Sequence, residues 1–303
     1  MLAKRLFRRI TVDRVFHLLG AAVTLFVLSL LLILLALLTY QGIGRLSFDF
    51  LVSFPSRHAE KAGILSAWVG SLLVVIVTVL SAVPLGVAAG VYLEEYAKRN
   101  WLSTVIEINI ANLAGVPSII WGLLALGLFI YQFGLGHSVL TAGLTLSLLV
   151  LPIVIISTRE ALRTVPKRIK EASLALGATK WQTIWYHVLP YSLGGILTGA
   201  IIGVSRALGE TAPLITIGAL TYVAFLPEVP ISASFPFFGA HSLNWLHSGF
   251  TVLPIQMFNW ISRPQHEFHL NAAAAGMVLI LITLSLNAIA ILIRYRFRKR
   301  VKW

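Results

Sequence analysis

Six long apolar runs constrain this chain more than any other feature of its sequence. They lie near residues 18–40, 65–92, 106–131, 138–158, 194–220 and 271–293. A helix rises about 1.5 Å per residue, so about 20 residues cross the roughly 30 Å of hydrocarbon in a bilayer. Charged residues make up 12% of the chain, which is about half of what a soluble domain carries. We therefore predict an all-α integral membrane protein with six transmembrane helices.

A basic segment precedes the first run, as it does in secretion signals. The apolar region of a signal holds only about 7–15 residues, and an A-x-A-like cleavage site follows it. The first run is longer, and no such site follows it. We therefore interpret this run as a retained first helix.

The Lys and Arg residues between the runs predict the orientation of the chain. If the amino terminus is cytoplasmic, 19 of them lie inside and 4 lie outside, as the positive-inside rule expects. The outside residues are Arg45, Arg57, Lys61 and Arg263. An odd number of helices would place the basic carboxyl-terminal tail outside. The even count therefore agrees with cytoplasmic locations for both termini.

The charge and the missing motifs exclude several classes of function. On a soluble chain, the net charge of +13 would suggest a nucleic-acid partner. Here the basic residues flank apolar runs, so membrane orientation explains them and no nucleic-acid partner is expected. The sequence contains no cysteine, no G-x-x-x-x-G-K-[ST], no H-E-x-x-H and no G-x-S-x-G. We expect a non-enzymatic subunit without catalytic residues, a metal site or a cofactor of its own.

The inside segment between the fourth and fifth runs predicts two short helices joined at a glycine. Residues 168–176 are rich in helix formers, and Gly177 ends or bends this first helix. Pro190 is expected to close the second one. Small residues on the first helix allow another protein to approach closely. The second helix carries apolar residues at helical spacing, namely Trp181, Ile184, Trp185 and Val188. Its aromatic residues are expected to anchor it to the helices above.

This segment resembles the EAA loop of binding-protein-dependent ABC importer permeases. The matching positions are Glu171, Ala172, Gly177, Leu189 and Pro190, whereas Ser173 replaces the second alanine and His187 replaces the usual isoleucine. The resemblance implies a type I ABC importer permease architecture with a cytoplasmic coupling helix. In that family, the loop inserts into a groove of a separate ATPase and transmits its closure to the transmembrane helices. An ordinary amphipathic connector is the alternative.

Two opposite charges lie inside the fifth apolar run. Arg206 and Glu210 are four residues apart and therefore share one helix face. A charge at this depth costs about 2.5–3.5 kcal/mol, so it needs a partner or water. The arginine fork also suits phosphate oxygens. The pair is either part of a substrate pathway, with Ser205 and Thr211 donating hydrogen bonds along the same path, or a permanent pair that fixes helix packing.

The resemblance extends to permeases of phosphate importers of the PstA type. The similar blocks lie at residues 84–96, 112–118, 206–213 and 251–256. The resemblance implies phosphate transport across the bacterial inner membrane. It also implies a PstC-like permease subunit, two ATPase subunits that bind ATP and magnesium, and a periplasmic phosphate-binding protein.

The chain is accordingly divided into three parts. Residues 1–64 hold the cytoplasmic amino terminus, the first helix and an external loop, residues 65–293 form the permease domain, and residues 294–303 form a basic cytoplasmic tail. Membrane lipid surrounds the helices. Four alternatives stay open: a permease for sulfate or molybdate, the PstC-type subunit, a stand-alone ion-coupled secondary transporter, and an inert scaffold.

Prolines distinguish the middle runs from the outer two. Each of the second to fifth runs contains one, namely Pro84, Pro117, Pro152 and Pro213. Proline removes a backbone donor and kinks a helix. We therefore predict that these four helices form the pathway wall and that the first and sixth serve as scaffold.

Two flanking segments have less specific interpretations. Glu94 and Glu95 end the second run and are interpreted as a solvated face that offsets Lys98 and Arg99. The outside segment at residues 221–270 is rich in aromatic residues and prolines. We interpret it as packing at the interface or between helices, with a dock for an outside partner as the alternative.

Overall fold

The computed structural model describes residues 2–98, 100–220, 222–227 and 243–300, and all of the regular structure within these residues is helical. The α-helices are α1 (Leu2–Gly42), α2 (Phe48–Val52), α3 (Leu65–Val91), α4 (Trp101–Leu113), α5 (Ser118–Ala125), α6 (Val139–Arg163), α7 (Lys167–Ala175), α8 (Lys180–Thr183), α9 (Leu189–Gly209), α10 (Ala212–Thr216), α11 (Asn244–His247), α12 (Leu253–Ile261) and α13 (His266–Arg300). The 3-10 turns are η1 (Ile43–Arg45) and η2 (Ala59–Lys61), and the π-helical turns are η3 (Tyr92–Tyr96), η4 (Leu126–Gln132) and η5 (Ile184–Val188).

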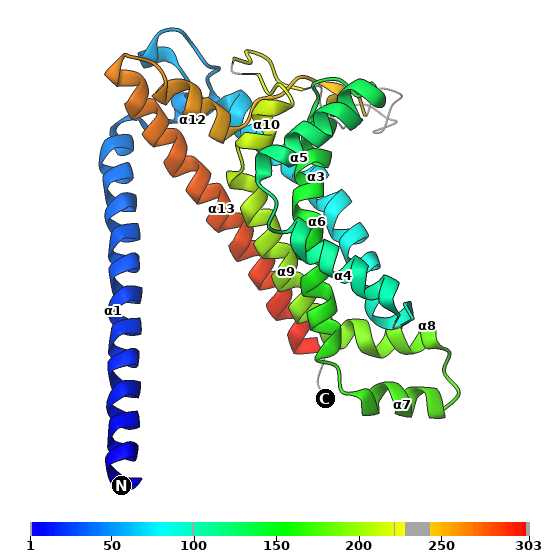
Figure 1. Cartoon of the computed structure of the whole chain (residues 1–303). Coiled ribbons are helices and arrows are strands. Elements are labelled where there is room, and N and C mark those ends of the chain that lie inside the picture. The colour runs from blue at the N-terminus through cyan, green and yellow to red at the C-terminus, as the bar shows by residue number, and fades with distance from the viewer. Residues whose placement is uncertain (1, 99, 221, 228–242, 301–303) are drawn as a thin grey trace.

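Five helical segments within the described residues are long and apolar enough to cross a membrane. They are Val12–Arg45, Leu65–Tyr96, Val139–Arg163, Lys180–Gly209 and His266–Arg296. A bent pair of helices supplies a sixth crossing if it counts as one span. In Figure 1 the amino-terminal end of α1 and the carboxyl-terminal end of α13 lie at the same end of the molecule as α7 and α8. We term this end the α7 end. Helix α12 lies at the opposite end, which we term the α12 end. The all-α membrane fold is thus confirmed.

The third run does not form the single helix predicted for residues 106–131. Instead, α4 and α5 meet at an angle of 106° across a short break. Pro117 disfavours a helical conformation at the residue before it and removes a backbone donor. It precedes α5 as its N-cap, with a ψ of 134°. The proline therefore explains why the helix breaks at this point.

The fifth run also differs from its predicted boundaries of 194–220. Its helix, α9, ends at Gly209, Glu210 is extended, and a separate short helix, α10, follows. At its other end, α8, η5 and α9 form one continuous helical segment. The prediction that Pro190 closes the second short helix is therefore wrong. Proline is tolerated there because it lies in the first turn of α9, directly after a π turn in which Leu189 N donates to Ile184 O.

Small residues bring α3, α6 and α9 into close contact at the centre of the bundle. Gly195, Gly199 and Gly203 recur at every fourth position of α9 and all approach α6. A Cβ added at Gly199 would lie 1.8 Å from Ser157 Oγ of α6. Lipid removes the hydrophobic drive between membrane helices, so their association depends on such close packing.

The outside segment packs between helices where the structure describes it. The Trp260 ring of α12 lies 6.1 Å from the Phe50 ring and 6.4 Å from the Phe268 ring, measured between centroids. Leu253 is fully buried, and its backbone N–H donates to Ser71 Oγ of α3 at 2.9 Å. The packing interpretation is confirmed for α12, whereas residues 228–242 lie outside the described residues.

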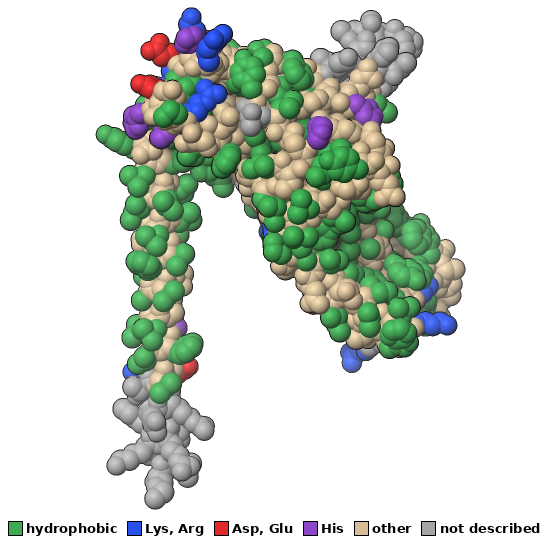
Figure 2. Space-filling model, turned by 45° about the horizontal axis from the view of Figure 1, so that its top comes forward, with side chains coloured by type: hydrophobic (Ala, Val, Ile, Leu, Met, Phe, Trp, Pro, Cys, Tyr) green, Lys and Arg blue, Asp and Glu red, His purple; other side chains and the backbone are tan. Residues whose placement is uncertain are grey.

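The first helix stands apart from the bundle over most of its length. It contacts α13 near its carboxyl end, where a Cβ at Gly42 would lie 2.7 Å from Ala274 N and Arg45 Nε donates to Asn271 Oδ1 at 2.7 Å. Toward the α7 end, α1 and α13 diverge in Figure 1. Figure 2 shows hydrophobic side chains along α1. Such a surface suits lipid or another apolar helix.

Candidate functional site

The segment that resembles a coupling helix forms a helical hairpin at the α7 end. Gly177 follows α7 with a φ of +86°, the left-handed conformation that glycine adopts without strain. Thr179 then starts α8 with a capping box, in which Thr179 Oγ1 accepts from Gln182 N and Gln182 Oε1 accepts from Thr179 N. These two local signals fix the turn between α7 and α8.

The predicted coupling residues lie on both sides of this hairpin. Glu171, Ala172 and Gly177 are exposed, whereas the buried Ser173 shares a 3.0 Å hydrogen bond with Thr183 of α8. Ser173 therefore joins the two helices in a way that an alanine would not. The remaining matched positions, Leu189 and Pro190, begin α9 and are partly buried.

The aromatic residues do not anchor the hairpin as predicted. Trp181 and Trp185 stack on each other at 5.5 Å and are more than half exposed, at 59% and 53%. The aliphatic members of the same pattern, Ile184 and Val188, are buried instead. Val188 packs with Leu162 of α6 in a small apolar cluster. The continuous helix into α9 explains the difference, because it directs the aliphatic stripe inward and the tryptophans outward.

Glu94 and Glu95 lie in surroundings that differ from the sequence interpretation. Their side chains are only 12% and 9% exposed, so they do not form the solvated face that was predicted. Glu95 is paired with Lys170 of α7, and Lys180 of α8 lies 4.9 Å from the centroid of the Tyr96 ring. The π turn η3 thus contacts both helices of the hairpin. The sequence does show charged side chains at the ends of neighbouring helices, which indicates that ion pairs can form there. It does not show which of these charges pair, because the partners are distant in sequence.

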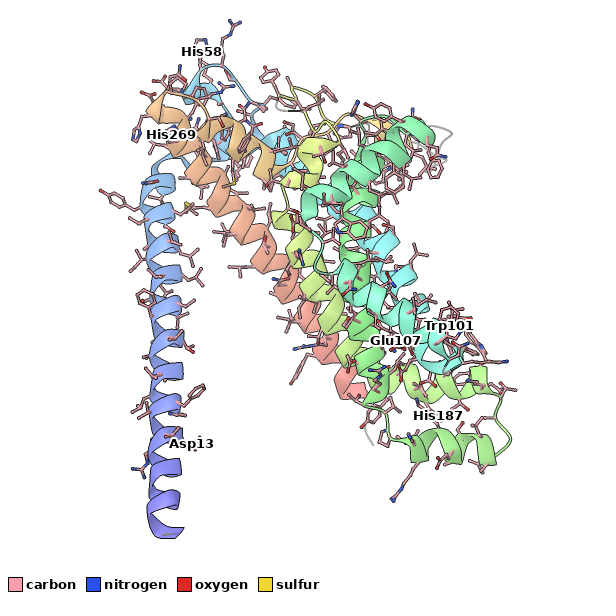
Figure 3. All side chains as sticks on the ribbon, in the orientation of Figure 1. Asp13, His58, Trp101, Glu107, His187 and His269 are labelled. Atoms are coloured by element: carbon pink, nitrogen blue, oxygen red, sulfur yellow. The ribbon has the colours of Figure 1, made fainter. Side chains whose placement is uncertain are left out.

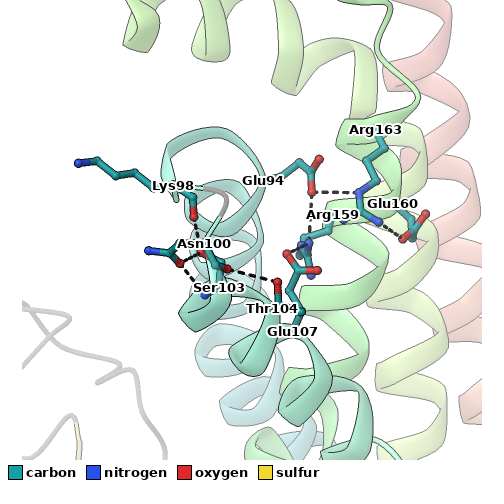
Figure 4. Close-up of polar contacts among 9 residues, drawn as sticks. All are labelled: Glu94, Lys98, Asn100, Ser103, Thr104, Glu107, Arg159, Glu160 and Arg163. Carbon is teal, nitrogen blue, oxygen red and sulfur yellow. Dashed lines mark hydrogen bonds and ion pairs between the residues drawn. The ribbon is translucent and has the colours of Figure 1, made fainter.

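A second group of charges lies beside this contact (Figure 4). Arg159 of α6 has a side chain that is 9% exposed, and its Nη2 lies 2.5 Å from Glu107 Oε1 and 3.4 Å from Glu94 Oε2. Glu94 also accepts from Arg163 Nε at 3.0 Å, and Arg163 pairs with Glu160 at 3.0 Å. Glu94, Glu107, Arg159 and Arg163 border a polar cavity of about 910 Å³ at the α7 end.

The predicted intramembrane pair is formed at the end of α9. Arg206 Nε lies 3.2 Å from Glu210 Oε1, and the two side chains are 43% and 18% exposed. Ser205 instead turns toward α13, where its hydroxyl donates to Asn287 Oδ1 at 2.6 Å. Thr211 is partly buried beside α10. The structure therefore brings Arg206 and Glu210 together and directs Ser205 to a neighbouring helix.

Comparison with known proteins agrees with this architecture. Residues 82–303 match the family described as binding-protein-dependent transport system inner membrane component. The chain is 36% identical over 192 residues to the probable ABC transporter permease protein YqgI of Bacillus subtilis (strain 168), across 62% of this chain and 65% of that protein. It is 34% identical over 225 residues to phosphate transport system permease protein PstA 1 of Mycobacterium tuberculosis (strain CDC 1551 / Oshkosh), across 74% of this chain and 67% of that protein.

A solved structure shares the fold. A chain of the inward-facing MetNI methionine ABC transporter superposes with a TM-score of 0.54 at 16% identity, covering 77% of this chain and 94% of that one. At this identity the likeness concerns the fold alone. Because the family match includes the α7–α8 hairpin and every helix from α4 to α13, this chain belongs to the inner membrane components of binding-protein-dependent transport systems.

Proposed function

We propose that this chain is the PstA-type permease subunit of an ATP-driven phosphate importer and forms half of the translocation pathway. The accessible Arg206–Glu210 pair at the end of α9 is the observation that carries the substrate assignment. A guanidinium can bind two oxygens of a tetrahedral oxyanion, and Glu210 occupies it when the pathway is empty. The names of relatives such as PstA 1 support phosphate as that oxyanion.

The partners follow from the two ends of the molecule. The α7 end faces the cytoplasm, so both termini lie inside, and two ATPase subunits bind ATP and magnesium there. The α12 end faces the periplasmic phosphate-binding protein, and a PstC-like subunit supplies the second half of the pathway. The basic residues at the α7 end support this orientation under the positive-inside rule.

Transport then works through alternating access. Closure of the ATPases moves the α7–α8 hairpin, and the helices joined to it open the pathway on one side at a time. Arg206 steers the anion without retaining it, because tight binding within a pathway would slow release. Glu210 assists release by competing for the guanidinium.

Reconstitution tests the substrate. The purified four-component importer in liposomes is expected to accumulate phosphate, and phosphate-loaded binding protein is expected to stimulate its ATPase activity. The parallel measurement uses sulfate-loaded binding protein. If only sulfate-loaded binding protein stimulates the ATPase activity, the substrate is sulfate and not phosphate. Gradient-driven uptake by this chain without the ATPase subunits would contradict the importer assignment.

Gly177→Val is expected to reduce phosphate uptake by the assembled importer about tenfold, because a left-handed conformation costs a side chain about 1–2 kcal/mol. A Cβ at Gly177 would meet no atom within 4 Å, so a clash cannot cause the effect. Gly177→Asn is the matched control, since asparagine tolerates this conformation. Equal uptake by the two variants would show that the turn conformation does not matter for coupling. Co-purification of the ATPase measures docking separately.

A further inference from the structure

The ion-pair group around Arg159 joins α4 to the pair of helices α3 and α6. The α3–α6 pair is closely packed, whereas α4 is not. Arg159 lies on α6, Glu94 lies in η3 at the end of α3, and Glu107 lies on α4. Figure 3 places Glu107 at the same end of the molecule as His187 of η5. We propose that Arg159 is a switch residue, which holds α4 through Glu107 in the state described here and transfers to Glu94 when α4 moves away during transport.

The α3–α6 side of this group is rigid. A Cβ at Gly90 of α3 would lie 2.7 Å from Thr158 Cβ of α6, and one at Gly86 would lie 2.7 Å from Val154 Cγ1. Helices in such close contact move together, because packed interfaces deform little. Glu94 and Arg159 therefore stay near each other whatever α4 does.

The α4 side is loosely held. Among its 13 residues none is buried, and Ile108 and Leu102 are 55% and 50% exposed. The neighbouring helical elements lie close to it in sequence, since η3 ends at Tyr96 and α5 begins at Ser118. Within the described residues, the Glu107–Arg159 pair is the one ion pair that ties α4 to the bundle. A helix that one ion pair ties to the bundle can move as a rigid body when that pair is exchanged.

The exchange leaves no buried charge without a partner. Arg159 is 9% exposed at its side chain, and an uncompensated charge at such a site is strongly unfavourable. Glu94 Oε2 already lies 3.4 Å from Arg159 Nη2, so a small shift completes the second pair. Arg163, which shares Glu94 now, is 45% exposed and is solvated when Glu94 turns to Arg159. The two states thus differ in which carboxylate holds Arg159.

The neighbouring residue connects this switch to the coupling hairpin. Glu95 follows Glu94 in the π turn η3 and is paired with Lys170 of α7. Movement of α7 therefore acts on the same turn that presents Glu94 to Arg159. Such a continuous chain of polar contacts is a physical route from the hairpin to α4.

The test measures the position of α4 in the complete importer. The chain has no cysteine, so spin labels at Ile108→Cys on α4 and Leu85→Cys on α3 report one distance, provided that the other subunits are made cysteine-free. The two states, with Arg159 held by Glu107 or by Glu94, are expected to give two different distances. Glu107→Gln is expected to shift the equilibrium between them toward the Glu94 state at least about fivefold, the lower end of typical coupling between sites. Glu94→Gln is expected to shift it at least about as far in the opposite direction, because it removes the alternative partner of Arg159.

The matched control is Glu160→Gln, which removes a carboxylate of the same group that pairs with Arg163 and not with Arg159. It is expected to leave both distance populations unchanged. A purely structural ion-pair group predicts shifts in the same direction for the two Arg159 partners, and that result would overturn the proposal. If the variants do not assemble, the label distance is measured in the complex that carries only the two labelled cysteines, with and without trapped ATP. A single distance that is the same in both conditions would also overturn the proposal. This readout does not depend on the transported solute, so its failure is distinct from failure of the phosphate assignment.

Discussion

Arg206→Ala is expected to reduce phosphate uptake by the reconstituted importer about ten- to hundredfold. A hydrogen bond to a charged group contributes about 1.5–3 kcal/mol, and each 1.4 kcal/mol changes a rate about tenfold. The amount of assembled complex is measured for each variant, because the loss of Arg206 leaves Glu210 within the membrane without its partner. Uptake of labelled phosphate by proteoliposomes, normalised to assembled complex, is the measurement.

Two further variants distinguish transport from helix packing. Arg206→Lys keeps the charge but loses the bidentate fork, so intermediate uptake is expected. Glu210→Gln leaves the arginine free to meet the anion and is expected to affect uptake much less than Arg206→Ala. If Arg206→Ala and Glu210→Gln reduce uptake equally, the pair is structural. Unchanged uptake in Arg206→Ala would favour the scaffold alternative.

Gly199→Val is expected to destabilise the folded permease by about 1–3 kcal/mol, the usual cost of overpacking a well-packed interior. The added side chain would occupy the space of Ser157, whose Cβ lies 2.1 Å from the position of the new Cβ. Separation of α6 from α9 relieves this clash, at the expense of the close contact that holds these membrane helices together. Thermal unfolding of the purified complex in detergent measures the loss.

The chain supplies a matched control five residues away on the same helix. A Cβ at Gly194 would meet no atom within 4 Å. Gly194→Val introduces the same side chain into α9, with the same change in intrinsic helix propensity. Its unfolding temperature is expected to stay close to that of the unchanged protein. Equal destabilisation by both variants would show that backbone freedom, and not the α6–α9 contact, sets the effect.

Much of the fold could be predicted from sequence because lipid imposes simple constraints. Every backbone polar group in a bilayer must be paired internally, so an apolar run of sufficient length becomes a helix. The α7–α8 hairpin likewise depends on local signals, because Gly177 and the Thr179–Gln182 capping box act within a few residues. The spacing of Gly195, Gly199 and Gly203 was also visible in the sequence, although its partner helix was not.

Other features depended on contacts between distant residues. Arg159 and Glu107 are 52 positions apart in the sequence and lie in different apolar runs or at their ends. In the sequence, Glu94 and Glu95 resemble the solvated end of a helix. In the structure they are paired with residues of α6 and α7. The pairing of Ser205 with Asn287 likewise joins residues 82 positions apart.

The sequence by itself determined that this chain crosses the membrane, where most of its helices lie, and which segment resembles a coupling helix. Hydrophobic length, proline and glycine are properties of a short stretch of chain, so they act before any long-range contact forms. Only the tertiary structure decided how sharply α4 and α5 bend, which aromatic residues face outward, and which carboxylates hold Arg159. Those outcomes depend on which surfaces meet when the helices pack, and that choice is made by the whole bundle.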